Sequence, residues 1–278
     1  MNACKVKKIA ITCMVILLSA CSSAWQPKKI TDVNNLHGLR VGVNLSWESD
    51  YLLTGRNDME IYRYDTMADM LMALNYDKID AIAADLILCK MLETATDGVE
   101  RVEPAFGETG YVLYFNPRRQ DCLDEYNAFL VEYMKTDDYR DYQEREKNYD
   151  ESTFDPPIIP QTGTGETLNV AVESAGYPRA FFDTEGNILG YDTEALIKFA
   201  NAYNYQLNLV PTGYENAILG LKNDLYDIAV GYISDAYRLE AEEYGILVSE
   251  PFTITPVYFL QKTKPTITFD YTWFEEEE

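Results

Sequence analysis

Histidine is almost absent from this sequence: His37 is the only one among 278 residues, and it stands before the first expected strand. No Ser-His-Asp set can be assembled without a histidine at the site. The phosphate-loop pattern G-x-x-x-x-G-K-S/T does not occur, and neither His37 nor the cysteines have metal-ligand spacing. We therefore expect no catalytic residue, no metal and no cofactor.

Positive charge is scarce as well. The sequence has 23 lysines and arginines against 46 aspartates and glutamates, for a formal net charge of -23. Such a field repels nucleic acid and anionic lipid headgroups, so we expect no nucleic acid among the partners. The closing run Glu275–Glu278 is typical of a solvated tail.

Long hydrophobic runs are lacking too, since the apolar stretch at 9–18 is too short to span a bilayer comfortably. Three lysines precede it and the letters LSAC follow, which is the layout of a secretory signal. LSAC is similar to a bacterial lipobox, in which the cysteine is lipidated. We expect a signal peptide at 1–20, lipidation of Cys21 and a tether at 21–36; the alternative is an ordinary signal with a chance cysteine.

Cysteine is sparse in the mature chain, where only Cys89 and Cys122 remain besides Cys21. Both stand in helix-like contexts, and whether they pair stays open. We do not expect the fold to depend on a disulfide. The chain has 278 residues and 47% hydrophobic content, which is enough for a sizeable core. Its length suits two compact lobes.

One stretch of the chain occurs twice in similar form. LMALNYDKIDAIAAD at 71–85 and ILGLKNDLYDIAVGY at 218–232 each read as a helix end, a polar corner and an apolar strand that opens with Asp. The matched pairs are Leu74 with Leu221, Asp77 with Asp224, and Asp80 with Asp227. Asp85 follows the first strand, and Arg238 lies in the loop after the second.

Strands and helices alternate along the chain. We expect strands at 39–45, 60–64, 80–85, 110–115, 167–173, 206–211 and 226–232, helices at 66–76, 123–147, 193–204 and 214–224, and an extended segment to Lys262. The helix at 123–147 carries an apolar stripe of Tyr126, Phe129, Leu130, Tyr133 and Met134. This alternation predicts a mostly parallel sheet in each lobe, with ligands at the carboxyl ends of the strands.

The sequence resembles a known family, bacterial extracellular solute-binding protein family 3, the polar amino-acid type that serves ABC importers. The segment LNVAVESAGYPRAFFDTEGNILGYDTEALIKFANAYNYQLNLV resembles the opening of that family, and YDIAVGYISDAYR and VSEPF are similar to its next landmarks. LHGLRVGVNLSWESDYL and RYDTMADMLMALNYDKIDAIAAD resemble the start and the Asp-bearing strand of its second lobe. The resemblance therefore implies that the lobes occur in permuted order.

The fold class implied is a two-lobed α/β fold, periplasmic-binding-protein-like of type II, with helices on both faces of each sheet and a hinge of two crossing strands. The expected layout after the tether is a second-lobe-like segment at 37–107, a hinge strand and long helix at 108–149, a linker at 150–166, a first-lobe-like segment at 167–251, a hinge strand at 252–264 and an acidic tail at 265–278.

A small zwitterion enclosed between two lobes needs a cation for its carboxylate, an anion for its ammonium and an apolar wall. Arg238 presents a planar fork suited to a carboxylate, and Asp85 can accept from an ammonium. By resemblance, these positions match the carboxylate-binding arginine and the amine-binding aspartate of the family. The alternatives are that Arg238 pairs with Glu242 and that Asp85 caps the helix after its strand.

Four further residues complete the candidate ligand site. By resemblance, Tyr177 and Tyr214 match aromatic positions that pack on the ligand, and Gly231 precedes the loop whose backbone holds the carboxylate. Trp47 is a further candidate wall, with packing within the lobe as its alternative. With 22 tyrosines in the chain, a core role is the alternative for each tyrosine.

The chain departs from the family pattern at the site. Pro178-Arg179-Ala180 stands in place of Pro-Pro-Phe, Ile233 and Asp235 replace hydroxyl residues before the arginine, and Ser46-Trp47 replaces Gly-Thr. An anion close to Asp235 would be repelled. An α-amino acid is the leading ligand, and a more cationic ligand or a site that has lost binding remain alternatives.

The function expected is that of a solute-binding protein, lipid-anchored at the extracytoplasmic face of the cell membrane, that captures an amino acid or related amine for an ABC transporter permease. We expect a monomer and no enzyme activity. The alternatives are a degenerate or sensory lipoprotein, and a dehydratase or lyase in which Asp85 or Glu173 acts as acid or base.

Overall fold

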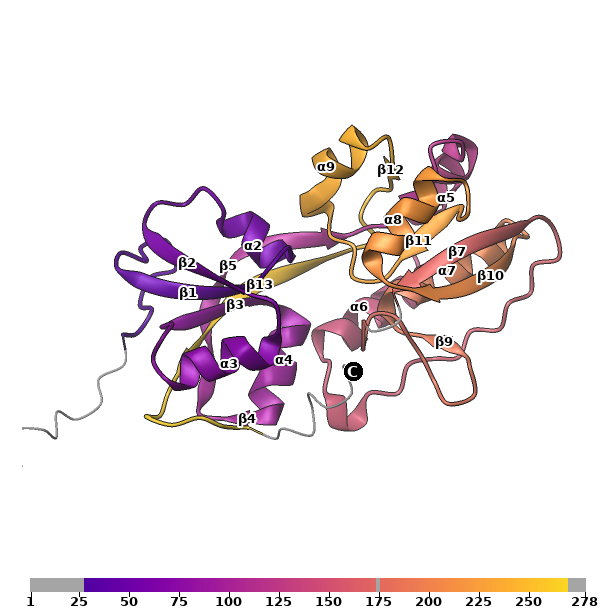
Figure 1. Cartoon of the computed structure of the whole chain (residues 1–278). Coiled ribbons are helices and arrows are strands. Elements are labelled where there is room, and N and C mark those ends of the chain that lie inside the picture. Colours follow the sequence, from indigo (N-terminus) through magenta and orange to yellow (C-terminus); the bar gives the residue numbers. More distant parts are fainter. Residues whose placement is uncertain (1–27, 174–175, 270–278) are drawn as a thin grey trace, which may run out of the picture.

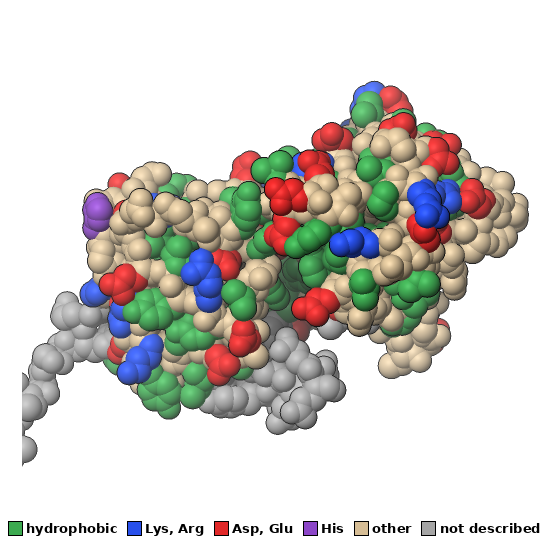
Figure 2. Space-filling model, turned by 45° about the horizontal axis from the view of Figure 1, so that its top comes forward, with side chains coloured by type: hydrophobic (Ala, Val, Ile, Leu, Met, Phe, Trp, Pro, Cys, Tyr) green, Lys and Arg blue, Asp and Glu red, His purple; other side chains and the backbone are tan. Residues whose placement is uncertain are grey.

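The computed structural model describes residues 28–173 and 176–269. The expected signal peptide, Cys21 and the closing acidic run lie outside the described residues. Two five-stranded sheets form two lobes, which stand side by side in Figure 1 and as two bodies in the space-filling view of Figure 2.

The N-lobe sheet has the strand order β2-β1-β3-β13-β5. Its elements are β1 (Leu39–Asn44), α2 (Glu48–Leu53), β2 (Met59–Tyr64), α3 (Met67–Asn75), β3 (Ala81–Asp85), α4 (Leu86–Ala95), β5 (Val99–Tyr111) and β13 (Thr253–Lys262). A two-stranded sheet of β4 (Thr96–Asp97) and β14 (Thr268–Phe269) adjoins α4, so the expected tail at 265–278 begins with a short strand.

The C-lobe sheet has the order β10-β7-β11-β6-β12. Its strands are β6 (Tyr114–Phe115), β7 (Thr167–Glu173), β10 (Gln206–Thr212), β11 (Ile228–Val230) and β12 (Leu247–Val248), with the hairpin β8 (Phe181–Phe182) and β9 (Ile188–Leu189) beside them. Its helices are α5 (Gln120–Tyr133), α6 (Asp137–Lys147), α7 (Tyr191–Ala202), α8 (Tyr214–Lys222) and α9 (Arg238–Glu243), with the short η1 (Glu151–Thr153) and η2 (Asp235–Tyr237).

Both sheets are built on one plan. In each, three parallel strands are followed by one antiparallel strand that continues from the other lobe: β13 beside β3, and β6 beside β11. The long strands β5 and β13 also pair with each other along the crossing, where Tyr111 lies opposite Thr253 (Figure 1). This topology confirms the expected two-lobed fold with mostly parallel sheets and a hinge of two crossing strands.

Helices cover both faces of each sheet because alternate strand residues point to opposite faces. In β3, Ile82 and Ala84 pack in the core under α3 and α4, whereas Ala81 and Ala83 pack in the core that contains Leu53 of α2. In β7, Leu168, Val170 and Val172 face the aromatic core of α5 and α7, and Ala171 faces α8.

The repeated stretch forms the same corner in the two lobes. Asp77 and Asp224 adopt left-handed φ values of 55° and 59°, a conformation that Asp tolerates better than most residues. The carboxylate of Asp80 accepts from the backbone N–H of Arg40 on β1 at 2.9 Å. The carboxylate of Asp227 accepts from Asn169 on β7 at 2.8 Å. Each strand-opening Asp therefore fixes its strand against the first strand of its lobe.

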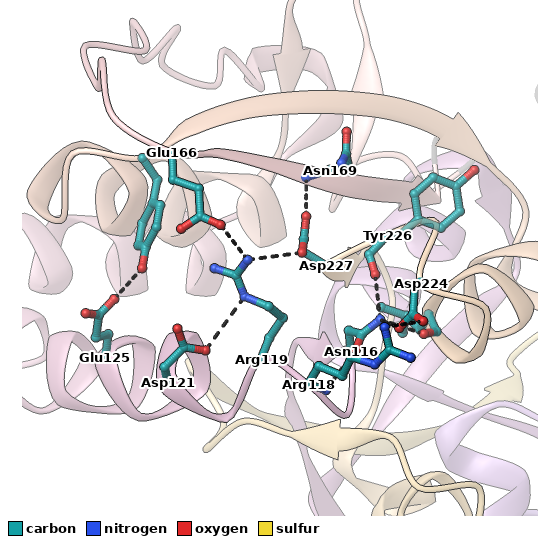
Figure 3. Close-up of polar contacts among 12 residues, drawn as sticks. Asn116, Arg118, Arg119, Asp121, Glu125, Glu166, Asn169, Asp224, Tyr226 and Asp227 are labelled. Carbon is teal, nitrogen blue, oxygen red and sulfur yellow. Dashed lines mark hydrogen bonds and ion pairs between the residues drawn. The ribbon is translucent and has the colours of Figure 1, made fainter.

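The strand that enters from the other lobe closes each corner. At the end of β13, the buried Lys262 donates to Asn75 O and to Asp77 Oδ1, both at 2.8 Å. After β6, the buried Asn116 donates to Leu221 O at 2.8 Å and to Asp224 Oδ1 at 3.0 Å (Figure 3). The two lobes thus share both their topology and the polar contacts that hold it.

The single helix expected at 123–147 is wrong, because two helices, α5 and α6, occupy this segment. Thr136 interrupts it: its hydroxyl accepts from Tyr139 N at 3.1 Å, and two acidic residues follow in the first turn of α6. A Thr cap followed by acids is a strong start signal for a new helix. The expected apolar stripe is nonetheless packed in the core.

The linker at 150–166 is held in extended form against the end of α7. Asn201 accepts from Thr162 N at 2.8 Å and donates to Pro160 O at 2.9 Å.

Cys89 and Cys122 are free, buried thiols, and burial raises the pKa of Cys122 to about 12. Within the described residues, no helix has the length and apolar character needed to cross a membrane.

Candidate functional site

The two lobes touch across the seam between them. Tyr237 Oη of the C-lobe donates to Trp47 O of the N-lobe at 2.8 Å, and the rings of Trp47 and Tyr232 are 5.7 Å apart. Lys90 of α4 donates to the Lys147 carbonyl at the end of α6. Figure 2 shows acidic and hydrophobic side chains gathered along this seam. The two lobes are therefore in direct contact, and we call this the closed arrangement.

Arg179 lies at the centre of this closed seam with 0% of its surface exposed. Its backbone stands in the turn between β7 and β8, where Arg179 O accepts from Asp192 N at 2.8 Å. Gly190 allows this approach: it has φ +118°, and a Cβ there would lie 2.3 Å from Arg179 O. Only glycine fits comfortably at this position.

Three carboxylates surround the guanidinium of Arg179. Its Nη2 lies 2.8 Å from Glu146 Oε1 and 3.5 Å from Asp85 Oδ2, and its Nη1 lies 3.0 Å from Asp192 Oδ1. The guanidinium carbon is also 3.4 Å from the centre of the Tyr111 ring. Burying a charge is costly unless such partners compensate for lost hydration, and a facing aromatic ring adds to them.

Neutral groups hold these carboxylates in place. Tyr111 Oη donates to Asp85 Oδ2 at 2.7 Å, and Thr253 Oγ1 donates to Glu146 Oε2 at 2.6 Å. The Tyr232 N–H donates to Asp192 Oδ2 at 2.8 Å. The carboxylates come from β3, α6 and α7, so elements from both lobes converge on one cation.

A fourth carboxyl group, Glu48 in the first turn of α2, is buried beside this cluster. Burial raises the pKa of Glu48 to about 8, and the charge of Asp85 adds to the effect. Burial also raises the pKa of Asp192 to about 6, against the opposing pull of Arg179. The site is therefore acidic in excess of its arginine and retains a proton near neutral pH.

Replacing Glu48 with glutamine should flatten the dependence of stability on pH. The folded-state pKa of about 8 exceeds the ordinary value of 4.5, so the folded state binds the extra proton. The contribution of protonated Glu48 to the free energy of unfolding is complete below about pH 4.5 and is lost as the pH rises through 8. We expect Glu48→Gln to raise the melting temperature at pH 8 and leave it almost unchanged at pH 4.5.

Melting curves at the two pH values test this, with the exposed Glu215→Gln as the control. Equal effects of the two substitutions at pH 8 would contradict a protonated, buried Glu48.

Asp85 lies within this cluster. Besides its contacts with Arg179 and Tyr111, its Oδ1 accepts from Leu88 N at 2.8 Å and caps α4. Trp47 packs on Tyr232 across the seam. Gly231 directly follows β11 and has φ +113°, and a Cβ there would lie 2.9 Å from Glu173 O.

The guanidinium of Arg238 contacts residues of its own lobe. Its guanidinium donates to Val248 O at 3.2 Å and to Ser249 O at 2.6 Å, and Glu242 is 4.0 Å away. The cationic neighbour of Asp85 is Arg179 instead. Whether Arg238 holds a ligand carboxylate stays a prediction.

The two candidate tyrosines lie outside the group around Arg179. Tyr177 packs edge-on against Phe181 and Phe154, with ring centres 4.9 and 5.7 Å away. Phe154 in turn lines a hollow of about 640 Å³ beside the linker. Tyr214 begins α8 and is 42% exposed. Their proposed contacts with a ligand remain untested.

Sequence reasoning missed most of the cluster, namely Arg179, Glu146, Asp192, Tyr111, Tyr232 and Glu48. One signal was visible: a charged residue within the turn Pro178-Arg179-Ala180, where the resembled family has an apolar pattern. That departure indicates a lost aromatic wall, but it equally marks a new buried cation.

Comparisons with known proteins found matches among solved structures alone. No protein-family model and no curated protein sequence matches the chain.

Among the described residues, no group of three or more His, Cys, Asp or Glu side chains is placed to hold a metal ion.

Several solved structures are similar at low identity. One is the GluR0 ligand-binding core in complex with L-glutamate, at 12% identity over 81% of this chain and 84% of that chain, with a TM-score of 0.37. Another is the ancestral amino acid-binding protein AncCDT-1, a precursor of cyclohexadienyl dehydratase, at 11% identity over 81% and 82%, with a TM-score of 0.40. A third is the probable amino-acid ABC transporter extracellular-binding protein ytmK from Bacillus subtilis, at 11% identity over 82% and 85%, with a TM-score of 0.41.

Proposed function

We propose that this protein is a solute-binding protein that captures a small polar ligand with an ammonium group, an amino acid or related amine, between its two lobes. The observation that carries the proposal is that three carboxylates from both lobes, Asp85, Glu146 and Asp192, converge on one fully buried cation. In this structure that cation is the guanidinium of Arg179. A buried, preorganised set of carboxylates favours a cationic group. The sequence resemblance independently assigns Asp85 to the ligand amine.

We propose the cellular setting from the sequence signals alone. A lipid on Cys21 would hold the protein at the extracytoplasmic face of the cell membrane, where it would deliver the solute to an ABC transporter permease as a monomer. The lobes would occur in permuted order relative to the resembled family. The proposed role is binding without chemistry.

A second candidate is a lipoprotein of the same fold that binds no solute. The observation that favours it is Arg179 itself, which already fills the charge site beside Asp85. In that case the closed arrangement would be the permanent state of the protein.

A thermal-shift screen of the purified mature domain distinguishes the two candidates. The panel should contain amino acids, polyamines and short peptides, each paired with the analogue that lacks the amino group, such as glycine with acetate. We expect at least one amine to raise the melting temperature while its partner does not, because ligand binding stabilises the folded state. A flat response to the whole panel would contradict solute binding and favour the second candidate.

A further inference from the structure

Arg179 differs from an ordinary buried arginine in where its partners come from. Glu146 and Asp192 belong to the same lobe as Arg179, but Asp85 ends β3 in the other lobe, and Tyr111 lies on the strand that crosses between them. The side chain therefore reaches across the seam. An arginine that served only to neutralise Glu146 and Asp192 would not need a partner in the N-lobe.

The guanidinium also stands in the place that a solute would need. A ligand ammonium held by Asp85 would sit within hydrogen-bond reach of its carboxylate, and Arg179 Nη2 is 3.5 Å from Asp85 Oδ2. The same guanidinium lies 3.4 Å from the centre of the Tyr111 ring, as a ligand cation over an aromatic wall would. Two cations cannot share this space.

We propose that Arg179 is an intramolecular cationic occupant of the site between the lobes, which takes the place of a solute's cation beside Asp85 and holds the lobes closed. The identification of that place with the solute site rests on the proposed function. The occupancy itself rests only on the contacts of Arg179. A solute amine must displace this side chain, so Arg179 lowers the apparent affinity for amines.

Two features make such displacement physically reasonable. Arg179 stands in a turn between two strands rather than within a helix or sheet. Its buried Nε has no hydrogen-bond acceptor among the described residues, so the internal cation is held by only part of its donors. An unpaired buried donor weakens the bound state of the group that carries it.

The occupancy is tested by removing the side chain and supplying its head group in solution. Arg179→Ala leaves Glu146, Asp192 and Asp85 around a space that held a guanidinium. We expect this variant to melt below the wild type and to regain a large part of the difference, saturably, in millimolar methylguanidinium chloride. The wild type, whose site is filled, should show no such rise.

The controls separate a site from a general salt effect. Sodium chloride and tetramethylammonium chloride at equal ionic strength should not restore Arg179→Ala. Arg145→Ala is the matched variant, because Arg145 also pairs with a buried carboxylate, Glu194 at 2.8 Å, but is 35% exposed and has this partner in its own lobe. Methylguanidinium should not stabilise that variant.

A folded Arg179→Ala that ignores methylguanidinium would overturn the proposal. If Arg179→Ala does not fold alone, refolding it and Arg179→Met in methylguanidinium replaces the melting test. Recovery of folded protein in methylguanidinium alone would support the occupancy. Failure of both variants to fold, with and without methylguanidinium, would overturn the proposal, because a cavity that binds the cation should restore folding.

The amine panel run on both proteins keeps this inference separate from the proposed function. If amines bind, their affinity for Arg179→Ala should be roughly tenfold or more above that for the wild type, and equal affinities would count against displacement. Rescue by methylguanidinium without an amine response in either protein would leave the internal occupant standing and reject the solute role. Binding of an amine without rescue of Arg179→Ala by methylguanidinium would support the solute role and reject the internal occupant.

Discussion

Replacing Arg179 with methionine should lower the free energy of unfolding by about 3–5 kcal/mol, the usual cost of removing one partner from a buried charge cluster. Methionine keeps most of the apolar stem but leaves Glu146, Asp192 and Asp85 in a dry site without a cation. At about 1.4 kcal/mol per decade, this corresponds to a loss of two or more orders of magnitude in the folding equilibrium constant.

Urea denaturation of the wild type and the variant measures this difference. Arg145→Met is the control: Arg145 is 35% exposed, and its partner Glu194 keeps Lys198 at 2.7 Å. A pair of this kind contributes on the order of 1 kcal/mol or less. Equal losses for the two variants would show that Arg179 is not the centre of a buried cluster.

Replacing Asp85 with asparagine should weaken binding of any amine identified in the panel by roughly 2–5 kcal/mol, or about thirty-fold or more. Asparagine keeps the shape and an oxygen that can still cap α4 at Leu88, so the loss reports the missing charge. Calorimetric titration measures it, with melting curves of the ligand-free proteins beside it.

Arg238→Ala is the matched variant for this titration. The family resemblance predicts that it loses the partner of a ligand carboxylate, whereas its contacts with the Val248 and Ser249 carbonyls predict a lower melting temperature without ligand. Amine affinity within a few-fold of the wild type in Asp85→Asn would reject Asp85 as the amine partner, whatever Arg238→Ala does.

Much of the fold could be predicted because its signals are local. The alternation of apolar strands with amphipathic helices spans fewer than twenty residues at a time, and the cap of α3 at Thr66 is complete within four residues, where Thr66 accepts from Asp69 N at 3.1 Å. The repeated stretch predicted two equivalent corners, which the bonds of Asp80 and Asp227 confirm. The break at Thr136 had a local signal too, but the apolar stripe hid it.

The cluster in the seam could be predicted only in part, because its contacts are long-range. Asp85 was found since it follows a strand of the repeated unit, where ligand-facing residues gather in α/β folds. Arg179 reaches Glu146 and Asp192 at sequence separations of 33 and 13 residues, and no periodicity encodes such pairs. A buried arginine reads in sequence like an exposed one until its partners are placed around it.

The most direct test of the seam is a double-mutant cycle between Arg179 and Asp85, which lie in different lobes. Unfolding free energies of the wild type, Arg179→Met, Asp85→Asn and the double variant give their coupling. A guanidinium that bridges the lobes predicts a coupling of roughly 1–3 kcal/mol, with the double variant less destabilised than the sum of the single ones. Additivity within about 0.5 kcal/mol would contradict a cation shared between the lobes.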